Sequence, residues 1–517
     1  MLFNSYAFIF LFLPVTLAGF FLLARAGPRL AAGWVTAASL FFYGWWNPLY
    51  VALLAGSILF NYALGLAIVR SEAAGRAAHR KRLLVFAVAA NLGVLAYYKY
   101  ANFFLDNVNA ALGTAANLGE IILPLGISFF TFTQIAFLAD AYQGKAREYS
   151  LVHYGLFVTY FPHLIAGPVL HHGEMMPQFG QPAIYRLNYD DIAAGLTIFV
   201  IGLFKKVIIA DGVGGYVAPV FDAPQSGLTL TFLEAWCGAL AYTFQLYFDF
   251  SGYSDMAVGL SLLFGVRLPI NFHSPYKAAN IIEFWRRWHM TLSRFLRDYL
   301  YFPLGGNRRG RARRYLNLMI TMLLGGLWHG AGWTFVIWGG LHGVYLVVNH
   351  AWRALRRRLG HDLDRPTARG RALGCAVTFL AVVVGWVIFR ASSMDAALAL
   401  LKAMAGMNGL VVPDAWLPKW GVLGEWLARH GVVFGATPAL GRTGVVHWIW
   451  ILLFVVWCAP NTQQVMARFR PALGVPPEPA TRWHWRPTAL GAGAISAMAL
   501  AVVLNLNRHS EFLYFQF

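Results

Sequence analysis

Long apolar segments recur along the chain and constrain its fold more than any other feature. A helix needs about 20 apolar residues to cross the hydrocarbon core of a bilayer. Apolar segments begin near residues 3, 31, 49, 83, 121, 151, 192, 228, 254, 315, 332, 372, 444 and 488. Because several are short or contain Gly and Pro, we expect about eleven to thirteen transmembrane helices, together with re-entrant and interfacial helices. The predicted fold class is an all-α polytopic membrane protein, with residues 1–517 forming one integral-membrane domain.

The composition excludes an ordinary soluble globular protein. Of the 517 residues, 58% are hydrophobic and 12% are charged, and the mean hydropathy is +0.55. The formal net charge of +19 would suit nucleic acid, but Lys and Arg gather in short loops, as the positive-inside rule requires. We therefore expect membrane lipids, and no nucleic acid, around this chain. Cys237, Cys375 and Cys458 stand alone in apolar segments without metal-ligand spacing, so we interpret them as small core residues and expect no metal site.

The charges of the loops assign sides of the membrane. Residues 70–82, 308–314 and 353–371 are rich in Arg and Lys and should be cytoplasmic, whereas residues 102–120 contain neither and should face outward. Counting transmembrane spans onward from the basic loop at residues 353–371 places the C-terminus outside the membrane. No basic n-region precedes the first apolar segment, so we interpret that segment as a retained span. Residues 394–442 mix charge, Pro and Gly, and predict an outer loop with short helices.

His329 lies in the stretch LWHGA at residues 327–331, between two apolar segments. The incoming arm, residues 315–327, is about 20 Å long as a helix, against a hydrocarbon core of about 30 Å. Because basic loops flank the two segments, the imidazole should lie at a turn inside the membrane. The glycines at 325, 326, 330 and 332 favour a tight turn and a close approach of backbone. An ionisable ring at that depth predicts a functional site lined by protein or water.

A second histidine lies in an amphipathic stretch at residues 281–302. If this stretch is one helix at the cytoplasmic interface, an aromatic face turns inward and an arginine face turns outward. The inward face carries Trp285, Trp288, His289, Leu292 and Leu296, and the other face carries Arg286, Arg294 and Arg297. His289 is either a site residue or a hydrogen-bonded core residue, and we interpret His342 as structural.

Two buried histidines suit acyl transfer, because a neutral imidazole can accept the proton of a hydroxyl or thiol. The chain contains no GxSxG elbow, Walker A loop, GxGxxG fingerprint or HExxH pair. Hydrolase, ATPase, dehydrogenase and zinc-protease functions therefore lose support. A transporter or flippase that uses buried histidines as a proton relay is the alternative from another class, although no internal repeat is evident.

A series of longer motifs follows one order between residues 120 and 345. They are ILPLGISFF at 122–130, AGP at 166–168, FDFSGYSD at 248–255, EFWRRWH at 283–289, RDY at 297–299, PLGGNR at 303–308 and GLWHGA at 326–331. In content and order they resemble the membrane-bound O-acyltransferase family, and within it the bacterial alginate and polysaccharide O-acetyltransferase branch. Residues 372–517 would add C-terminal helices and a tail.

The resemblance implies a ring of membrane helices around a central tunnel, where a cytoplasmic donor tunnel meets an outer funnel. It implies that His329 is the catalytic base and that His289 is a second polar site residue, which would orient donor or acceptor. Further substrate or tunnel-lining candidates are Trp285, Trp288, Trp328, Tyr253, Asp255, Asn271, Arg297 and Asp298. It implies no bound cofactor, because acetyl-CoA is a co-substrate. The basic residues 308–314 would attract the phosphates of acetyl-CoA near the cytoplasmic mouth of the tunnel.

The last residues of the chain, 511–517, resemble the F-x-Y-x-x-F ending of acyl-relay systems in this family. On that resemblance, Tyr514 would carry the acyl group outward, as a nucleophile that needs a nearby base. The alternative is that these aromatic residues anchor the end of the chain in the membrane interface.

The resemblance implies an O-acetyltransferase of the bacterial inner membrane. We expect it to pass acetyl groups from cytoplasmic acetyl-CoA across the membrane to hydroxyls of an exported polysaccharide such as alginate. Its expected partner is a periplasmic SGNH-type acetyltransferase, because nothing in the sequence looks like a polysaccharide-binding domain. D-alanyl transfer, or another acyl transfer by the same fold, stays open within the enzyme class.

Overall fold

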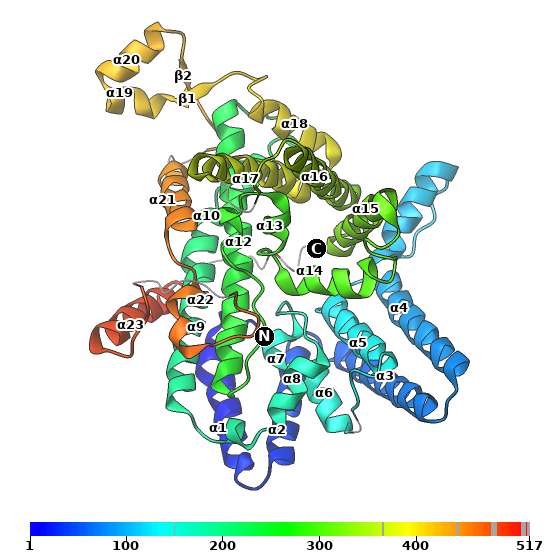
Figure 1. The fold of residues 1–517 in the computed structure, drawn as a ribbon. Helices are drawn as coiled ribbons and strands as arrows, with labels where there is room; N and C mark the ends of the chain where they lie inside the picture. The colour runs from blue at the N-terminus through cyan, green and yellow to red at the C-terminus, as the bar shows by residue number, and fades with distance from the viewer. Residues whose placement is uncertain (149, 364–366, 441–443, 477–482, 508–512, 514–517) are drawn as a thin grey trace.

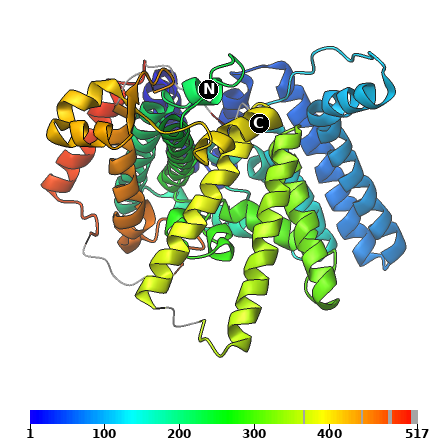
Figure 2. The ribbon, with the colours of Figure 1, turned by 90° about the horizontal axis from the view of Figure 1, so that it is seen from above.

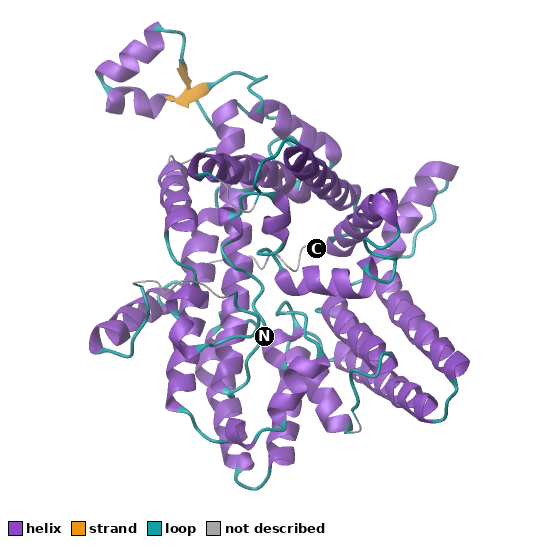
Figure 3. Ribbon diagram, in the orientation of Figure 1, coloured by secondary structure: helices purple, strands orange, loops and turns teal. Residues whose placement is uncertain are grey.

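The computed structural model describes residues 1–517 except 149, 364–366, 441–443, 477–482, 508–512 and 514–517. Helices make up nearly all of the regular structure (Figure 3), so the predicted all-α fold class is confirmed. Strands β1 (Val411–Pro413) and β2 (Val433–Gly435) form a parallel pair, which is an addition to the predicted architecture. They lie with two short helices in a lobe that projects from the helical body (Figure 1).

The N-terminal third begins with long helices and continues with short ones. Its elements are η1 (Phe8–Phe12), α1 (Leu13–Ala24), α2 (Pro28–Gly44), α3 (Leu49–Ala73), α4 (Ala77–Leu112), α5 (Ile127–Tyr142), α6 (Leu151–Thr159), α7 (Phe161–Leu164), α8 (His172–Phe179) and η2 (Pro182–Tyr185).

The central part carries the longest buried helix and the two candidate histidines. Its elements are α9 (Tyr189–Phe204), η3 (Lys205–Ala210), α10 (Asp211–Gly214), α11 (Ala218–Phe221), α12 (Phe232–Leu263), η4 (Pro275–Lys277), α13 (Ile281–Trp285), α14 (Met290–Leu296), η5 (Arg297–Tyr301), α15 (Gly310–His329) and α16 (Trp333–Arg358).

The C-terminal part contains three longer helices, α17, α21 and α23, and several short elements. They are α17 (Ala368–Arg390), α18 (Met394–Met404), η6 (Asp414–Trp416), α19 (Leu417–Trp420), α20 (Val422–Arg429), α21 (Gly444–Cys458), α22 (Thr462–Val465), η7 (Ala467–Phe469) and α23 (Ala489–Val503). The short helices between residues 394 and 442 agree with the loop that the sequence predicts there.

Helix α12 is the central support of the fold. The sequence predicts separate segments near residues 228 and 254, and this is wrong, because one continuous helix covers both. Glycines let α9 approach it closely: a Cβ on Gly202 would lie 2.6 Å from the Gly252 carbonyl oxygen, and one on Gly195 would lie 2.8 Å from that of Gly259. In lipid no hydrophobic force drives helices together. Small residues stabilise such crossings because they let the two backbones pack closely.

Several helices of the described chain are long and apolar enough to cross a membrane. Four meet that criterion: α3, α4, Tyr189–Gly214 and α17. Shorter apolar helices cover Phe8–Ala24, Gly444–Cys458 and Ala489–Val503. The protein is therefore a polytopic membrane protein, while the number of eleven to thirteen spans stays a prediction. In Figure 2 the basic α3–α4 and α16–α17 connections lie toward one face and the α4–α5 connection toward the opposite face, the arrangement that the loop charges predict.

Helices α15 and α16 form a hairpin whose turn follows His329. The incoming helix is longer than the predicted arm of residues 315–327, because its first turns include the basic residues 311–314. A Cβ on Gly326 would lie 2.2 Å from the Phe335 carbonyl oxygen, and one on Gly339 would lie 2.3 Å from that of Met322. These glycines therefore set the spacing of the hairpin. Gly330 has a φ of −159°, an extended conformation that any residue can adopt. Its role in the turn is to leave room for the Phe335 ring, with which a Cβ would collide.

Two predictions about local structure are wrong. Residues 281–302 are not one helix, because the chain leaves the helical path between α13 and α14 and His289 adopts a φ of 42°. Trp288, His289 and Leu292 are nevertheless buried as predicted, while Arg286 and Arg297 are exposed. Of the cysteines, Cys237 is buried, whereas Cys375 is partly exposed and Cys458 is exposed on the outer surface of α21, so these two are not core residues.

Candidate active site

Two cavities approach the candidate histidines from different parts of the fold. One, here called the outer cavity, has a volume of about 890 Å³ and lies beside the segment that follows the predicted outward loop. Residues 120–129 and the aromatic pair Trp45 and Trp46 form much of its wall. Trp328 and His329 line it as well, so His329 is accessible from this cavity.

The other cavity, here called the inner cavity, has a volume of about 650 Å³ and is lined mainly by α13, α14, η5, α15 and α16. Its wall includes Met290 and Thr291, which directly follow His289. It is also lined by arginines from separate segments: Arg286, Arg294, Arg297 and Arg314. The inner cavity therefore combines a cationic wall with an approach to His289.

His289 lies at the N-terminus of α14, at a break in the chain. Its left-handed backbone is uncommon for a residue with a side chain and has to be held by surrounding contacts. The amide of Met290 donates to the Asn271 carbonyl oxygen at 3.0 Å, and the Thr291 hydroxyl donates to the Asn271 side-chain oxygen at 2.6 Å. The ring is 1% exposed and meets the Phe250 ring edge-on, with centroids 4.8 Å apart.

Asn271 also fixes the proton position of the His289 ring. Its Oδ1 accepts from the Thr291 backbone amide at 3.4 Å, which identifies the oxygen end of this side chain. The His289 Nδ1 lies 3.3 Å from the same oxygen and must therefore donate to it. In the neutral ring this leaves Nε2 as the nitrogen without a proton, free to accept a hydrogen bond from a ligand.

His329 is the last residue of α15 and lies among aromatic rings. Its ring centroid is 5.2 Å from that of Trp338 and 5.3 Å from that of Phe389. The Trp328 indole connects the two sites, with its centroid 4.9 Å from the His329 ring and 6.2 Å from the His289 ring. The structure thus brings both predicted histidines to one indole, which lines the outer cavity.

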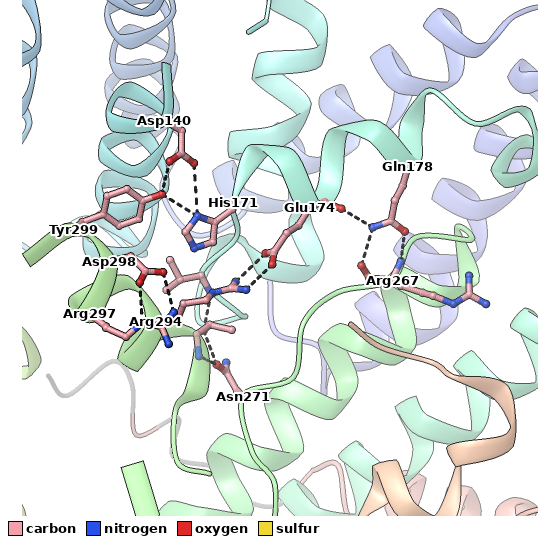
Figure 4. Close-up of polar contacts among 12 residues, drawn as sticks. Asp140, His171, Glu174, Gln178, Arg267, Asn271, Arg294, Arg297, Asp298 and Tyr299 are labelled. Atoms are coloured by element: carbon pink, nitrogen blue, oxygen red, sulfur yellow. Dashed lines mark hydrogen bonds and ion pairs between the residues drawn. The ribbon is translucent and has the colours of Figure 1, made fainter. Parts of the chain in front are cut away.

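A polar network holds the inner side of this arrangement in place (Figure 4). Arg294 of α14 makes a bidentate ion pair with Glu174 of α8. In η5, the Tyr299 hydroxyl donates to Asp140 of α5 at 2.8 Å and lies 2.9 Å from Nδ1 of His171. These contacts tie the segment after His289 to two other parts of the fold.

The remaining predicted site residues fall into different places. Trp285 and Arg297 line the inner cavity, Trp328 lines the outer cavity, and Asp298 pairs with Arg297 at 2.7 Å. Five predicted lining residues are absent from the described lining of both cavities: Asn271 and Asp298, whose contacts are given above, and Tyr253, Asp255 and Trp288.

The described contacts of Tyr253, Asp255 and Trp288 join them to other parts of the chain, and their place among the substrate-lining residues stays a prediction. Tyr253 stacks on Phe3 with ring centroids 4.8 Å apart, and Trp288 packs on Phe284. Asp255 pairs with Lys205 at 2.6 Å and accepts the Thr462 hydroxyl at 2.6 Å. Tyr514 lies outside the described residues, so its place relative to the histidines stays untested.

Some residues of the site do not follow from the sequence motifs. Lys99 of α4 lines the outer cavity and donates to the backbone of Trp328 and His329. The signal that could have found it is a single cation within an apolar run. Glu174 and Asp140 carry no comparable signal, because their importance comes from partners far away in the sequence. Within the described residues, no group of three or more His, Cys, Asp or Glu side chains could hold a metal ion.

Comparison with known proteins agrees with this architecture. Residues 16–392 match the model of the membrane-bound O-acyltransferase family. A peptidoglycan O-acetyltransferase from Helicobacter pylori is 47% identical over 437 residues, which cover 79% of this chain and 81% of the relative. A probable alginate O-acetylase from Pseudomonas putida is 44% identical over 411 residues, covering 78% of this chain and 80% of the relative.

A more distant relative is a teichoic acid D-alanyltransferase from Bacillus subtilis, 29% identical over 280 residues, which cover 52% of this chain and 69% of the relative. The extent of the family match and of the first two alignments favours acyl chemistry over a transporter or flippase. This chain is an acyltransferase and belongs to the membrane-bound O-acyltransferase family.

Proposed function

We propose that this enzyme passes acetyl groups from cytoplasmic acetyl-CoA through the bacterial inner membrane for O-acetylation of a glycan outside it. The observation that carries this proposal is the placement of two cavities beside two histidines that share one indole. Trp328 and His329 line the outer cavity, the two residues that follow His289 line the inner cavity, and the Trp328 ring lies near both histidine rings. An acceptor at His329 and a donor near His289 would thus approach one centre from two sides.

His329 is the proposed general base. It would take the proton of the acceptor hydroxyl while that oxygen attacks the carbonyl carbon of the thioester. Collapse of the tetrahedral intermediate breaks the carbon–sulfur bond, and the thiolate of CoA receives the proton from the His329 imidazolium. The products are an O-acetyl ester and free CoA. His289, with Nδ1 held by Asn271, would orient the donor at the inner side of the centre.

The inner cavity is the proposed donor site. Arg294 and Arg297 pair with Glu174 and Asp298. Arg286 has no ion pair with a carboxylate in the described part of the chain, and Arg314 contacts the His350 ring. Arg286 and Arg314 are therefore the arginines best suited to bind the phosphates of acetyl-CoA.

The acyl relay through Tyr514 is part of the proposal: the Tyr514 hydroxyl would be the acceptor of this first transfer, and a hydroxyl of the next acceptor would then attack the tyrosyl ester and release the Tyr514 phenol. Leu513, the residue before it, is 1% exposed and its backbone amide donates to Asp249 of α12. Leu513 belongs to the same buried cluster as Phe250 and Phe389, whose rings contact His289 and His329. Burial of Leu513 supports the relay more than an aromatic anchor at the membrane surface.

The names of the relatives support a glycan as the final acceptor. Because one is a peptidoglycan O-acetyltransferase and another a probable alginate O-acetylase, the acceptor of this enzyme would be a polymer outside the cytoplasm. A periplasmic SGNH-type acetyltransferase would complete the transfer. D-alanyl transfer is the less favoured function, because the relative of that name aligns with about half of this chain at lower identity.

Replacement of His329 tests the proposal. We expect His329→Gln to abolish acetylation of the cell-surface glycans, measured as ester-linked acetate released from purified peptidoglycan and exopolysaccharide. His447→Gln, at an exposed position of α21, is the matched control and should behave like the wild type. Wild-type acetylation in cells that hold correctly inserted His329→Gln protein would refute the role of His329.

A further inference from the structure

Lys99 reaches the end of the helix that presents His329. Its Nζ donates to the Trp328 carbonyl oxygen at 2.6 Å and to the His329 carbonyl oxygen at 3.1 Å. The hydroxyl of the next residue, Tyr100, donates to the Leu327 carbonyl oxygen at 2.9 Å. Two neighbouring residues of α4 thus satisfy three successive carbonyl groups of α15.

These carbonyl groups need donors from outside their own helix. The last four carbonyl groups of an α-helix have no partner within it, and the extended Gly330 ends α15 without continuing the backbone hydrogen bonds. Water can satisfy such groups at a protein surface but not in the hydrocarbon region. A cation is the favoured donor, because the C-terminus of a helix carries a partial negative charge.

The contacts of Lys99 are confined to this turn. A cation in a membrane helix is costly and is normally paired with an acidic side chain. No carboxylate pairs with Lys99 among the residues that the structure describes; its recorded contacts are the two carbonyl groups and the Trp328 ring, whose centroid lies 5.8 Å from Nζ. The charge therefore acts on the residue that connects both histidines and on His329 itself.

We propose that Lys99 is a positioning residue for catalysis, which fixes the backbone of Trp328 and His329 so that the imidazole faces the outer cavity at a constant place. This inference rests on the proposed role of His329 as the base. Lys99 lines the outer cavity and is absent from the described lining of the inner cavity, which contains the proposed donor arginines. Its loss should therefore impair turnover and leave donor binding unchanged.

The test compares three variants of the purified full-length enzyme with acetyl-CoA as the donor. Lys99→Met removes both hydrogen bonds, and we expect kcat to fall by about tenfold or more while KM for acetyl-CoA stays within about twofold of the wild type, because a displaced base slows the chemical step. Lys99→Arg keeps a cation with several donors and should recover part of kcat. Lys81→Met, at an exposed position of the same helix, is the matched control and should keep the kcat of the wild type.

Each outcome separates a positioning role from a structural one. A lower thermal midpoint with wild-type kcat per folded molecule in Lys99→Met would overturn the proposal, as would equal losses in Lys99→Arg and Lys99→Met. If Lys99→Met does not fold, Lys99→Gln carries the test, because its neutral amide ends one atom short of the lysine nitrogen and should lose the shared contact with both carbonyl groups; wild-type kcat in that variant would overturn the proposal. Activity in His329→Gln would instead refute the base assignment, whatever the Lys99 variants show.

Discussion

The Nδ1 atom of His289 lies 3.3 Å from the side-chain oxygen of Asn271, which also accepts the Thr291 hydroxyl and the Thr291 amide. The Asn271 side chain thereby holds the His289 ring and the start of α14 in place, and with them the left-handed backbone of His289. The Asn271 carbonyl oxygen adds a fourth contact, from the amide of Met290. Second-layer contacts of this kind set how precisely a site residue is oriented.

Replacing Asn271 should therefore reduce activity through His289. We expect Asn271→Ala to lower kcat by about tenfold or more, because the ring loses the acceptor that fixes its tautomer and orientation. The measurement is steady-state acetyl transfer by the purified variant. Ser254→Ala is the control: it removes the partner of the Asn271 amide nitrogen at 3.3 Å and leaves the oxygen contacts in place. Equal losses in both variants would mean that Asn271 matters for packing alone.

The four arginines of the inner cavity should differ in their effects. Arg286→Ala and Arg314→Ala should each raise KM for acetyl-CoA by several-fold, because these two side chains are the ones proposed to meet its phosphates. The rise should be smaller at high salt, where screening weakens charge interactions. KM measured at two salt concentrations checks both expectations.

Arg294→Ala is the comparison within the same cavity. Its loss leaves the partly buried Glu174 without its bidentate partner, so we expect a lower thermal midpoint. A large rise in KM for Arg294→Ala, with unchanged KM for Arg286→Ala and Arg314→Ala, would contradict the assignment of donor residues.

The sequence predicts the central features of the site because they depend on local patterns. Loop charge and segment length place His329 at an intramembrane turn, and the structure has a helical hairpin with His329 at its turn. The alternation of apolar and charged residues predicts that His289 is buried. The break between α13 and α14 cannot be predicted in this way. Contacts with Asn271, which lies outside both helices, stabilise the uncommon backbone of His289.

The sequence motifs and the described cavity linings do not coincide. Asp255 and Tyr253 lie in the FDFSGYSD motif, yet their contacts hold α12 against other segments and do not line the cavities in the described residues. Lys99 lies outside every motif, yet contacts the backbone of His329. Contacts between residues far apart in the sequence determine the surroundings of Asp255, Tyr253 and Lys99. The residue pattern within one segment does not predict such contacts.

The hairpin of α15 and α16 should tolerate no side chain at its crossing. Gly326→Ala would place a Cβ 2.2 Å from the Phe335 carbonyl oxygen, so the helices must separate, and we expect a loss of roughly 1–3 kcal/mol in stability. A thermal unfolding curve in detergent measures it. Gly93→Ala, in α4, is the control, because nothing lies within 4 Å of the added Cβ. Equal unfolding midpoints in the two variants would show that the crossing is not tightly packed.

Glu148, in the connection between α5 and α6, should make stability depend on acidic pH. Burial alone would raise the pKa of its carboxyl, but the hydrogen bond from His172 at 3.3 Å and that from the Ser150 amide at 2.8 Å outweigh burial and hold the pKa below its ordinary value. A carboxyl with a depressed pKa in the folded protein stabilises the fold above its ordinary pKa and loses that contribution as the pH falls through the folded value.

Glu148→Gln should therefore lower the thermal midpoint at neutral pH and reduce its further fall between about pH 5 and pH 3. The measurement is a series of unfolding curves across that range for both proteins. Glu425→Gln is the control, because Glu425 pairs with Arg429 on the exposed surface of α20, where such a pair contributes little. An acid limb as steep in Glu148→Gln as in the wild type would assign the pH dependence to other carboxyl groups.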